Sequence, residues 1–143
     1  MNRAILSAVA TGCLISLSAG AQRIKSANVP AVVKAALQHN YPSASRVSWE
    51  MEKGNYEANW GGASGEDHSV LFTPGGSFVE QVEAMAVAQL PAAVADYIRS
   101  HYPGAKITEA GKVTDAEGRT RYEAEVRGKD LLFDEKGNFL KFD

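Results

Sequence analysis

Apolar residues recur with helical spacing in two segments of the chain. The two stripes consist of Val29, Val32, Val33, Ala36, Leu37 and Tyr41 in the first segment, and of Leu90, Ala93, Val94, Tyr97, Ile98 and Tyr102 in the second. Residues spaced by three and four positions share one side of a helix, so each segment is predicted to be a helix that buries one face. A proline stands at each start, where its missing N–H costs little, and a second one ends each helix.

The segments after each helix alternate between apolar and polar residues with a period of two. The pattern is clearest at 47–52, 55–60 and 121–127. A period of two with one polar face is typical of an antiparallel sheet, and short glycine-containing turns separate the runs. The segment 107–113 alternates less cleanly, and its Gly111 is a candidate position for a β-bulge.

The two halves of this pattern are copies of one unit. Residues 29–81 and 90–142 match at an offset of 61 positions. Matching motifs occur in the same order in both copies: Tyr41-Pro42 with Tyr102-Pro103, Leu71-Phe72 with Leu132-Phe133, and Gly76 and Phe78 with Gly137 and Phe139. The motif Tyr-Glu-Ala at 56–58 recurs at 122–124, an offset of 66, so the second copy is longer before it and the first copy is longer after it. Such regularity indicates a repeat architecture.

These patterns predict an α+β protein made of two tandem repeats, each with one helix and about four antiparallel strands. One repeat alone has a thin core. We therefore expect the two sheets to join edge to edge into one sheet with both helices on one face, so that residues 22–143 form a single domain.

Residues 1–21 are typical of a secretory signal peptide. Arg3 is their only charge, an apolar run follows, and Ala19-Gly20-Ala21 supplies a cleavage pattern of small residues. We expect cleavage before Gln22 and a periplasmic or secreted protein. An alternative is lipoprotein processing, with Cys13 as a lipid anchor. Cys13 is the only cysteine, so the mature chain would contain neither disulfides nor thiolate metal sites.

Composition narrows the choice of partners. Once Arg3 is removed, 14 Lys and Arg stand against 17 Asp and Glu, a net charge of −3. No basic stripe with interleaved aromatic residues is present, so we expect no nucleic-acid partner. No further apolar run is long enough to cross a membrane, so we expect no transmembrane segment in the mature chain.

The duplicated order of helix, Tyr-Pro-x-Ala, strand, Tyr-Glu-Ala, strand, Leu-Phe and Gly-x-Phe resembles the beta-lactamase-inhibitor-like, PepSY-like proteins. The motifs that carry the resemblance are Leu90-Pro91, Tyr41-Pro42-Ser43-Ala44, Tyr102-Pro103-Gly104-Ala105, Tyr122-Glu123-Ala124-Glu125 and Leu132-Phe133-Asp134-Glu135-Lys136-Gly137. The resemblance implies a secreted or periplasmic protein with a fold similar to that of beta-lactamase inhibitory protein. It implies a role in restraining peptidases or in envelope sensing, and it brings no catalytic residues. That inhibitor is stapled by disulfides, whereas residues 22–143 contain no cysteine.

Three carboxylates are candidates for a site on the polar face of the sheet. Glu57 and Glu123 occupy equivalent positions in the two copies, and Glu125 follows in the same strand. If the copies pack symmetrically, the three could converge, and paired carboxylates can perform general acid–base chemistry. The simpler interpretation is a solvated polar face, with Arg121 and Arg127 as neighbours for cross-strand pairs.

The segment Gly61–His68 is the one asymmetric feature, because a two-residue turn replaces it in the second copy. Loops held on a rigid sheet often carry binding sites, so Glu66, Asp67 and His68 are candidate binding residues. The alternative is a tolerated insertion, because lengthening a surface loop costs little.

Other residues give weaker signals. His39 and His101 lie near the helix ends, where the helix dipole favours them, and no histidine pair has the spacing of metal ligands. Ser64 lacks the context of a nucleophile elbow. Trp49 and Trp60 fall on apolar strand faces and are interpreted as core residues.

The expected function is a non-enzymatic binding module that recognises a protein or peptide of the cell envelope and uses no cofactor. The recognition surface would be the polar sheet face or the loop Gly61–His68. Two alternatives remain open: a small-ligand or metal-binding periplasmic protein, and an inhibitor of a beta-lactamase or peptidase.

Overall fold

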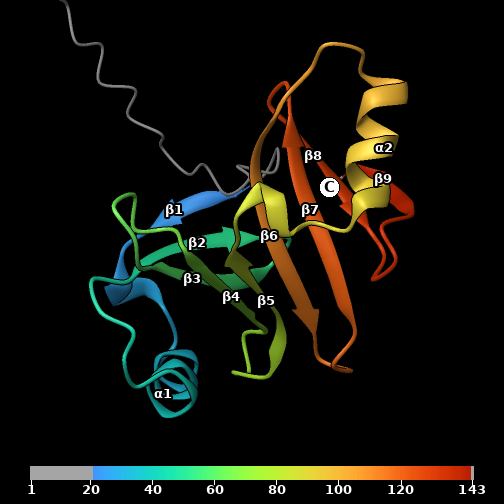
Figure 1. The fold of residues 1–143 in the computed structure, drawn as a ribbon. Coiled ribbons are helices and arrows are strands. Elements are labelled where there is room, and N and C mark those ends of the chain that lie inside the picture. Colours follow the sequence, from blue (N-terminus) through green and yellow to red (C-terminus); the bar gives the residue numbers. More distant parts are fainter. Residues whose placement is uncertain (1–20, 143) are drawn as a thin grey trace, which may run out of the picture.

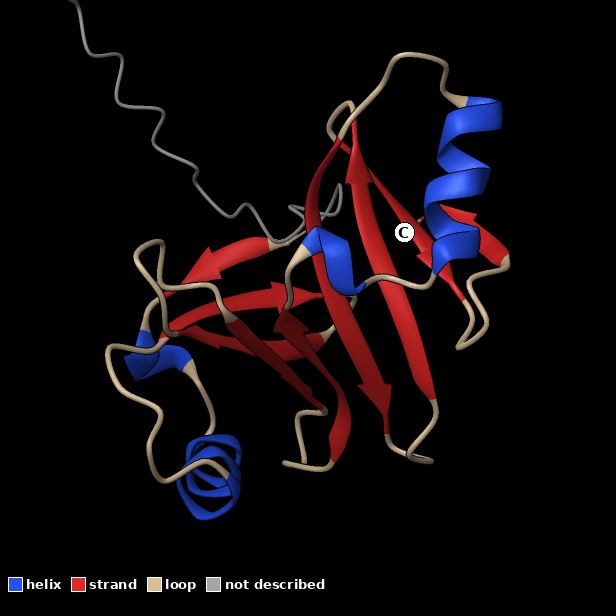
Figure 2. Cartoon of the chain, viewed as in Figure 1, coloured by secondary structure: helices blue, strands red, loops and turns tan. Residues whose placement is uncertain are grey.

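The computed structural model describes residues 21–142, which form one antiparallel sheet of nine strands in sequence order (Figures 1 and 2). The strands are β1 (Gln22–Ile24), β2 (Ser48–Glu52), β3 (Asn55–Trp60), β4 (His68–Phe72), β5 (Phe78–Ala84), β6 (Ile107–Asp115), β7 (Thr120–Val126), β8 (Lys129–Phe133) and β9 (Phe139–Phe142). The helices are α1 (Ala31–Asn40) and α2 (Ala92–His101), and the short 3-10 helices η1 (Ser26–Asn28) and η2 (Val87–Gln89) precede them. Residues 1–20 of the predicted signal peptide, which include Cys13, lie outside the described residues.

The structure confirms the two repeats. The two helices start 61 positions apart, and so do β4 and β8, and β5 and β9. Each repeat contains one helix and contributes four strands to the sheet. The additional strand β1 was not predicted, because three residues are too few to show an alternating pattern. It pairs with β2 through Gln22, Arg23 and Ile24 and forms one edge of the sheet.

The two helices begin and end in the same way. Pro30 and Pro91 precede the first helical residues with extended backbone angles. At the other end, the N–H groups of Tyr41 and Tyr102 donate to the carbonyls of Leu37 and Ile98, both at 2.8 Å. The following prolines cannot continue the helix, because they lack the N–H and restrict the residue before them. No helix within residues 21–142 is long and apolar enough to span a bilayer.

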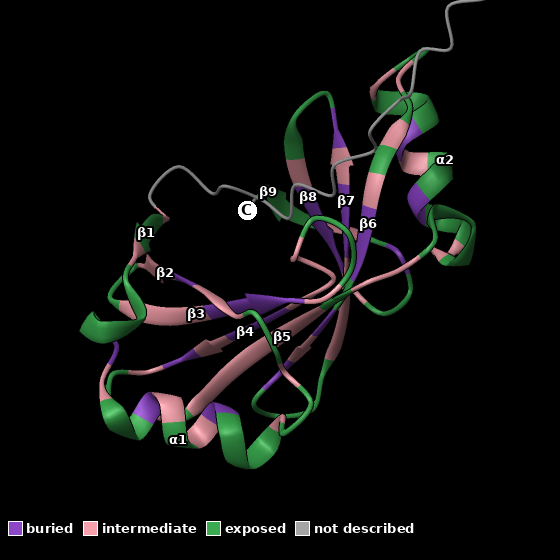
Figure 3. Ribbon diagram, turned by 90° about the vertical axis from the view of Figure 1, so that its left-hand side faces the viewer, coloured by how far each residue is buried: buried purple, intermediate pink, exposed green. Residues whose placement is uncertain are grey.

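Each helix covers its own half of the sheet with its own core (Figure 3). Val33 and Leu37 of α1 are buried against residues of β2, β3 and β4. The corresponding core of the second repeat is formed by Val94, Ile98, Ala124, Val126, Leu131 and Phe133. Both cores lie on the same face of the sheet, because the pairing His68–Glu83–Lys112–Tyr122–Phe133 runs across it without changing face. The prediction that both helices lie on one face of the sheet was therefore correct.

The halves join through β5 and β6, which pair from Glu80↔Asp115 to Ala84↔Gly111. Figure 1 shows the two halves inclined to each other at this junction, with α1 and α2 on their outer sides. Gly111 marks a close approach, since a Cβ there would lie 2.9 Å from Cγ1 of Val82. The irregular pairing in β6 falls between Ile107 and Glu109, so the bulge predicted at Gly111 was misplaced.

Candidate functional site: a hollow on the face opposite the helices

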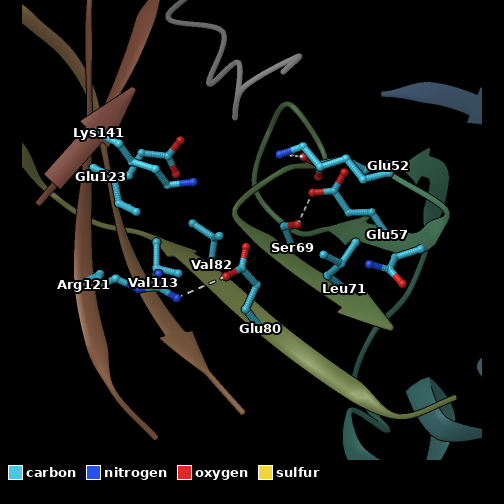
Figure 4. A pocket seen from close by; sticks show the side chains of 13 residues that line it. Glu52, Glu57, Ser69, Leu71, Glu80, Val82, Val113, Arg121, Glu123 and Lys141 are labelled. Atoms are coloured by element: carbon cyan, nitrogen blue, oxygen red, sulfur yellow. Dashed lines mark hydrogen bonds and ion pairs between the residues drawn. The ribbon is translucent and has the colours of Figure 1, made fainter. Parts of the chain in front are cut away.

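The sheet face opposite the helices, which we call the inner face, contains a hollow with a cavity volume of about 150 Å³ (Figure 4). Both repeats contribute to its lining, which consists of Glu52, Lys53, Asn55, Glu57, Ser69, Leu71, Glu80, Val82, Val113, Arg121, Glu123, Leu132 and Lys141. In Figure 4 the labelled side chains of the two halves face each other across β5. The inclination of the two halves therefore creates a concave surface that neither repeat would form alone.

Strand register places the lining in ordered rows. One row runs from Glu57 through Leu71 to Glu80. A second row runs from Ser69 through Val82 and Val113 to Arg121. A third row runs from Glu123 through Leu132 to Lys141. Each of these rows has polar or charged ends and an apolar middle, so the hollow offers polar groups above an apolar floor.

The carboxyl group of Glu57 is strongly perturbed by its surroundings in the hollow. It is only partly exposed, and the hydroxyl of Ser69 donates a short hydrogen bond to its Oε1. Burial raises the pKa of Glu57 from 4.5 to about 7. The hydrogen bonds from Ser69 and Asn59 oppose the rise, and the charges of Glu52 and Glu50 add to it. Near neutral pH, Glu57 therefore exists both protonated and ionised.

The structure brings Glu57 and Glu123 to the same hollow, as symmetrical packing required. Glu123 is buried, with 8% of its surface exposed. Glu125 lies on the same strand face but outside the lining, and it accepts a hydrogen bond of 2.8 Å from the hydroxyl of Thr108. The three carboxylates therefore share a face, but only two share the hollow.

Arg121 lies at the opposite end of the hollow from Glu57. Its Nη2 lies 3.5 Å from Glu80 and 3.3 Å from the buried Asp115. Its Nε is buried and forms no hydrogen bond within residues 21–142. Arg127 instead donates to the carbonyl of Pro103 at 3.1 Å, so it takes no part in the hollow. The predicted cross-strand pairing thus applies to Arg121, with partners on β5 and β6.

The segment Gly61–His68 is folded against the molecule. Its exposed residues are Gly62, Ala63 and Ser64, whereas Glu66, Asp67 and His68 are half-buried. The side chain of Asp67 packs over Gly62 and occupies the space that a Cβ there would need. The acidic pair is therefore held beside the sheet and not at the tip of the loop.

The three candidate residues of this segment face different surroundings. Burial raises the pKa of Glu66, and the charge of Glu50 raises it further, while Arg23 lowers it and Glu109 raises it. His68 was predicted in a loop but is the first residue of β4, where it stacks on Trp60 with ring centroids 5.4 Å apart. Because His68 points to the helix side, it cannot reach the hydroxyl of Ser69 on the inner face.

The remaining candidates take structural positions. Trp49 and Trp60 are buried beneath α1, as predicted. His101 stacks on Tyr97 within α2, with ring centroids 3.9 Å apart. Among residues 21–142, no three His, Cys, Asp or Glu side chains converge in a way that could hold a metal ion.

Sequence reasoning missed the polar and apolar residues that complete the hollow around the carboxylates. Ser69, Glu80 and Val82 belong to β4 and β5, whose contribution to the inner face depends on the register of the strands. The signal that was available is the alternation in 68–72, which places Ser69 and Leu71 on one face.

Comparison with known protein families identifies the class to which this fold belongs. The family described as "putative beta-lactamase-inhibitor-like, PepSY-like" matches residues 16–80 and again residues 63–141. The chain therefore belongs to this family, and the two matches correspond to its two repeats. The comparison with curated proteins gave no match.

Solved structures show the same fold. A protein of Bacteroides eggerthii, described as a "putative periplasmic" protein, is 23% identical, with a TM-score of 0.68 over 80% of this chain and 88% of its own. A DUF2874 family protein of Bacteroides uniformis is 24% identical, with a TM-score of 0.66 and the same coverage. A BLIP-like protein of Bacteroides fragilis is 24% identical, with a TM-score of 0.57 over 78% of this chain and 83% of its own.

Proposed function

We propose that this protein is an exported, non-enzymatic binding module that recognises a protein or peptide of the cell envelope through the inner face of its sheet. The observation that carries the proposal is the hollow, which is built jointly by both repeats on the face that the helices leave uncovered. The signal-like pattern of residues 1–21 supports export. Membership of an inhibitor-like family supports protein recognition.

The size of the hollow favours a protein partner over a small ligand. Pockets for small molecules usually measure roughly 300–1,000 Å³, whereas this hollow measures about 150 Å³. It is too small to enclose a cofactor-sized molecule, but it can receive one side chain from a larger surface that docks on the inner face. A partner that covers the sheet would also contact the rim residues Lys53 and Lys141, which belong to different repeats.

The chemistry around Ser69 also favours binding over catalysis. A nucleophilic serine needs a base to take its proton, usually a histidine that a third group orients. The hydroxyl of Ser69 donates to Glu57, and His68 is on the other side of the sheet. Ser69 thus lacks the histidine of the usual triad, and the Ser69–Glu57 pair can hold a polar group of a partner.

Affinity capture from an envelope extract of the source organism tests this proposal. Three variants are compared with the wild type: Lys141→Trp, which blocks the rim of the hollow; Arg99→Trp, which places the same bulk on the exposed surface of α2; and the double variant Glu66→Ala/Asp67→Ala in the loop. Recognition through the inner face predicts that the wild type and Arg99→Trp retain the partner. Lys141→Trp should lose it.

Loss of the partner only with the loop variant would move the site to the segment Gly61–His68. Turnover of substrates in a broad hydrolase panel by the purified protein would contradict the non-enzymatic role. Inhibition of a beta-lactamase or peptidase that depends on Lys141 would identify the partner class as an enzyme, which is the inhibitor form of the same proposal.

A further inference from the structure

We infer that the hollow receives a lysine side chain of the partner, with its ammonium group against Glu57 and its methylene groups against Leu71, Val82 and Val113. This inference rests on the proposed function, because it names the chemistry that the inner face recognises. It is built from the residues that line the hollow and from the contacts of Glu57.

The first step concerns charge. Glu57 is a partly buried carboxyl group whose hydrogen-bond donors are the neutral side chains of Ser69 and Asn59. Within residues 21–142, no lysine or arginine forms an ion pair with Glu57: Lys53 pairs with Glu52 at 3.5 Å, and Arg121 pairs with Glu80 and Asp115. An ionised carboxylate in partial burial is costly unless a cation joins it. A cation that stabilises the ionised form of Glu57 therefore has to come from outside the described chain.

The second step concerns shape. Leu71 is the direct cross-strand neighbour of Glu57, and Val82 and Val113 continue the apolar floor beside it. A lysine has four methylene groups that pack on apolar surface while the charged end reaches a polar group. The combination of an apolar floor and one carboxylate matches that side chain better than it matches a bare inorganic cation, which needs several oxygen ligands.

The third step distinguishes lysine from arginine. A guanidinium group binds a carboxylate best through two parallel hydrogen bonds that use both oxygens. In Glu57 the hydroxyl of Ser69 already donates to Oε1, and the side chain of Asn59 also donates to the carboxyl group. A compact ammonium group needs only one oxygen of Glu57 and can share other polar groups of the lining, so the arrangement favours lysine.

The charged groups that surround Glu57 set its response to pH. They are Glu50 and Glu52 on β2, Lys53 in the following turn, Glu80 on β5, Arg121 and Glu123 on β7, and Lys141 on β9. The ammonium group binds the ionised form, so a protonated Glu57 must lose its proton first. With a pKa of about 7 in the free protein, affinity should rise by roughly tenfold from pH 6 to pH 8.

Titration of the purified protein with n-butylammonium chloride, followed by NMR, tests the inference. We expect saturable shifts at the amides of Ser69, Leu71 and Val82, a roughly tenfold tighter Kd at pH 8 than at pH 6, and loss of binding in Glu57→Gln. Glu125→Gln is the matched control, because Glu125 lies on the same face outside the hollow, and it should bind like the wild type. Neutral n-butanol should give no saturable shifts.

Three results would overturn the inference: no saturable shift in the wild type, binding that is the same at both pH values, or binding that survives Glu57→Gln. Tighter binding of n-butylguanidinium at the same amides would show that the occupant of the hollow is an arginine side chain. Tighter binding of calcium chloride would show that it is a metal ion. If butylammonium fails while Lys141→Trp still abolishes partner capture, the inner-face function stands and only the lysine assignment fails.

Discussion

Glu57 shows how a single residue links the fold to the proposed recognition. Its place in β3 is fixed by alternation, since Tyr56 and Ala58 face the core and Glu57 must face the opposite side. The concave shape of the inner face then restricts water around it and raises the pKa of its carboxyl group. A group placed in this way weakens the fold when it is charged and strengthens binding when a partner supplies the opposite charge.

Replacing Glu57 by glutamine should change how stability depends on pH. A carboxyl group with a raised pKa holds its proton more tightly when folded, so its ionisation lowers stability as pH rises from about 4.5 to about 7. The full effect of such a rise is on the order of 3 kcal/mol. We expect Glu57→Gln to be more stable than the wild type at pH 8 and to match it near pH 4.

Urea unfolding at pH 4, 6 and 8 measures this difference. Glutamine keeps the shape of the side chain and can still accept the hydrogen bond from Ser69, so packing should be unchanged. A constant difference between the two proteins across this range would show that Glu57 titrates normally in the folded state.

At the scale of the element, Gly76 and Gly137 explain why both copies keep a glycine in the turn before their last strand. Both have positive φ angles, of 82° and 86°. A Cβ on Gly137 would lie 3.0 Å from Cβ of Ala93 and 3.2 Å from the backbone nitrogen of Val94, and a Cβ on Gly76 would lie 3.1 Å from the carbonyl oxygen of Val32. These two turns therefore press directly on the first turns of α1 and α2.

We predict that Gly137→Ala destabilises the protein more than Gly118→Ala. Gly118 also has a positive φ angle, of 78°, but a Cβ there would meet no atom within 4 Å. Alanine at Gly118 should cost about 1 kcal/mol for the backbone conformation alone, whereas alanine at Gly137 should cost about 1–3 kcal/mol more because it displaces α2. Thermal unfolding of the two variants gives the comparison, and equal losses would mean that the turn does not support the helix.

The elements of this fold were predictable because their signals are local. Both helices and most strands were predicted from the helical stripes of apolar residues, the prolines at the helix ends and the apolar–polar alternation. The duplication predicted the order of these elements. The register between strands was not predictable, because it depends on turns and long-range packing. That is why Glu57 and Glu123 could be named as candidates, whereas Ser69 and Val82 emerged only from the structure.

For the whole molecule, the two cores are distinct, but the sheet that carries them is continuous through β5 and β6. Both tryptophans lie in the core under α1, and Phe133 is fully buried in the core under α2. Removing the ring in Phe133→Ala should cost about 3–5 kcal/mol. We predict that it lowers the denaturation midpoint of tryptophan fluorescence and of circular dichroism together, because the halves unfold as one unit.

A fluorescence midpoint that stays at the wild-type value, while circular dichroism loses part of its signal earlier, would show that the repeats unfold separately. Phe72→Ala, at the equivalent position in the first core, is the matched control. It should lower both midpoints by a similar amount. Independent repeats would weaken the argument that the hollow between them is rigid enough to recognise a partner.

Site-specific photo-crosslinking tests the central claim that the partner docks on the inner face. A photoreactive phenylalanine analogue is placed at Lys53 or Lys141 on the rim of the hollow, and at Gln38 or Arg99 on the exposed surfaces of the helices. Illumination in the envelope extract should link the same partner to both rim positions and to neither helix position. Crosslinks from the helix positions alone, or equally from all four, would contradict recognition through the inner face.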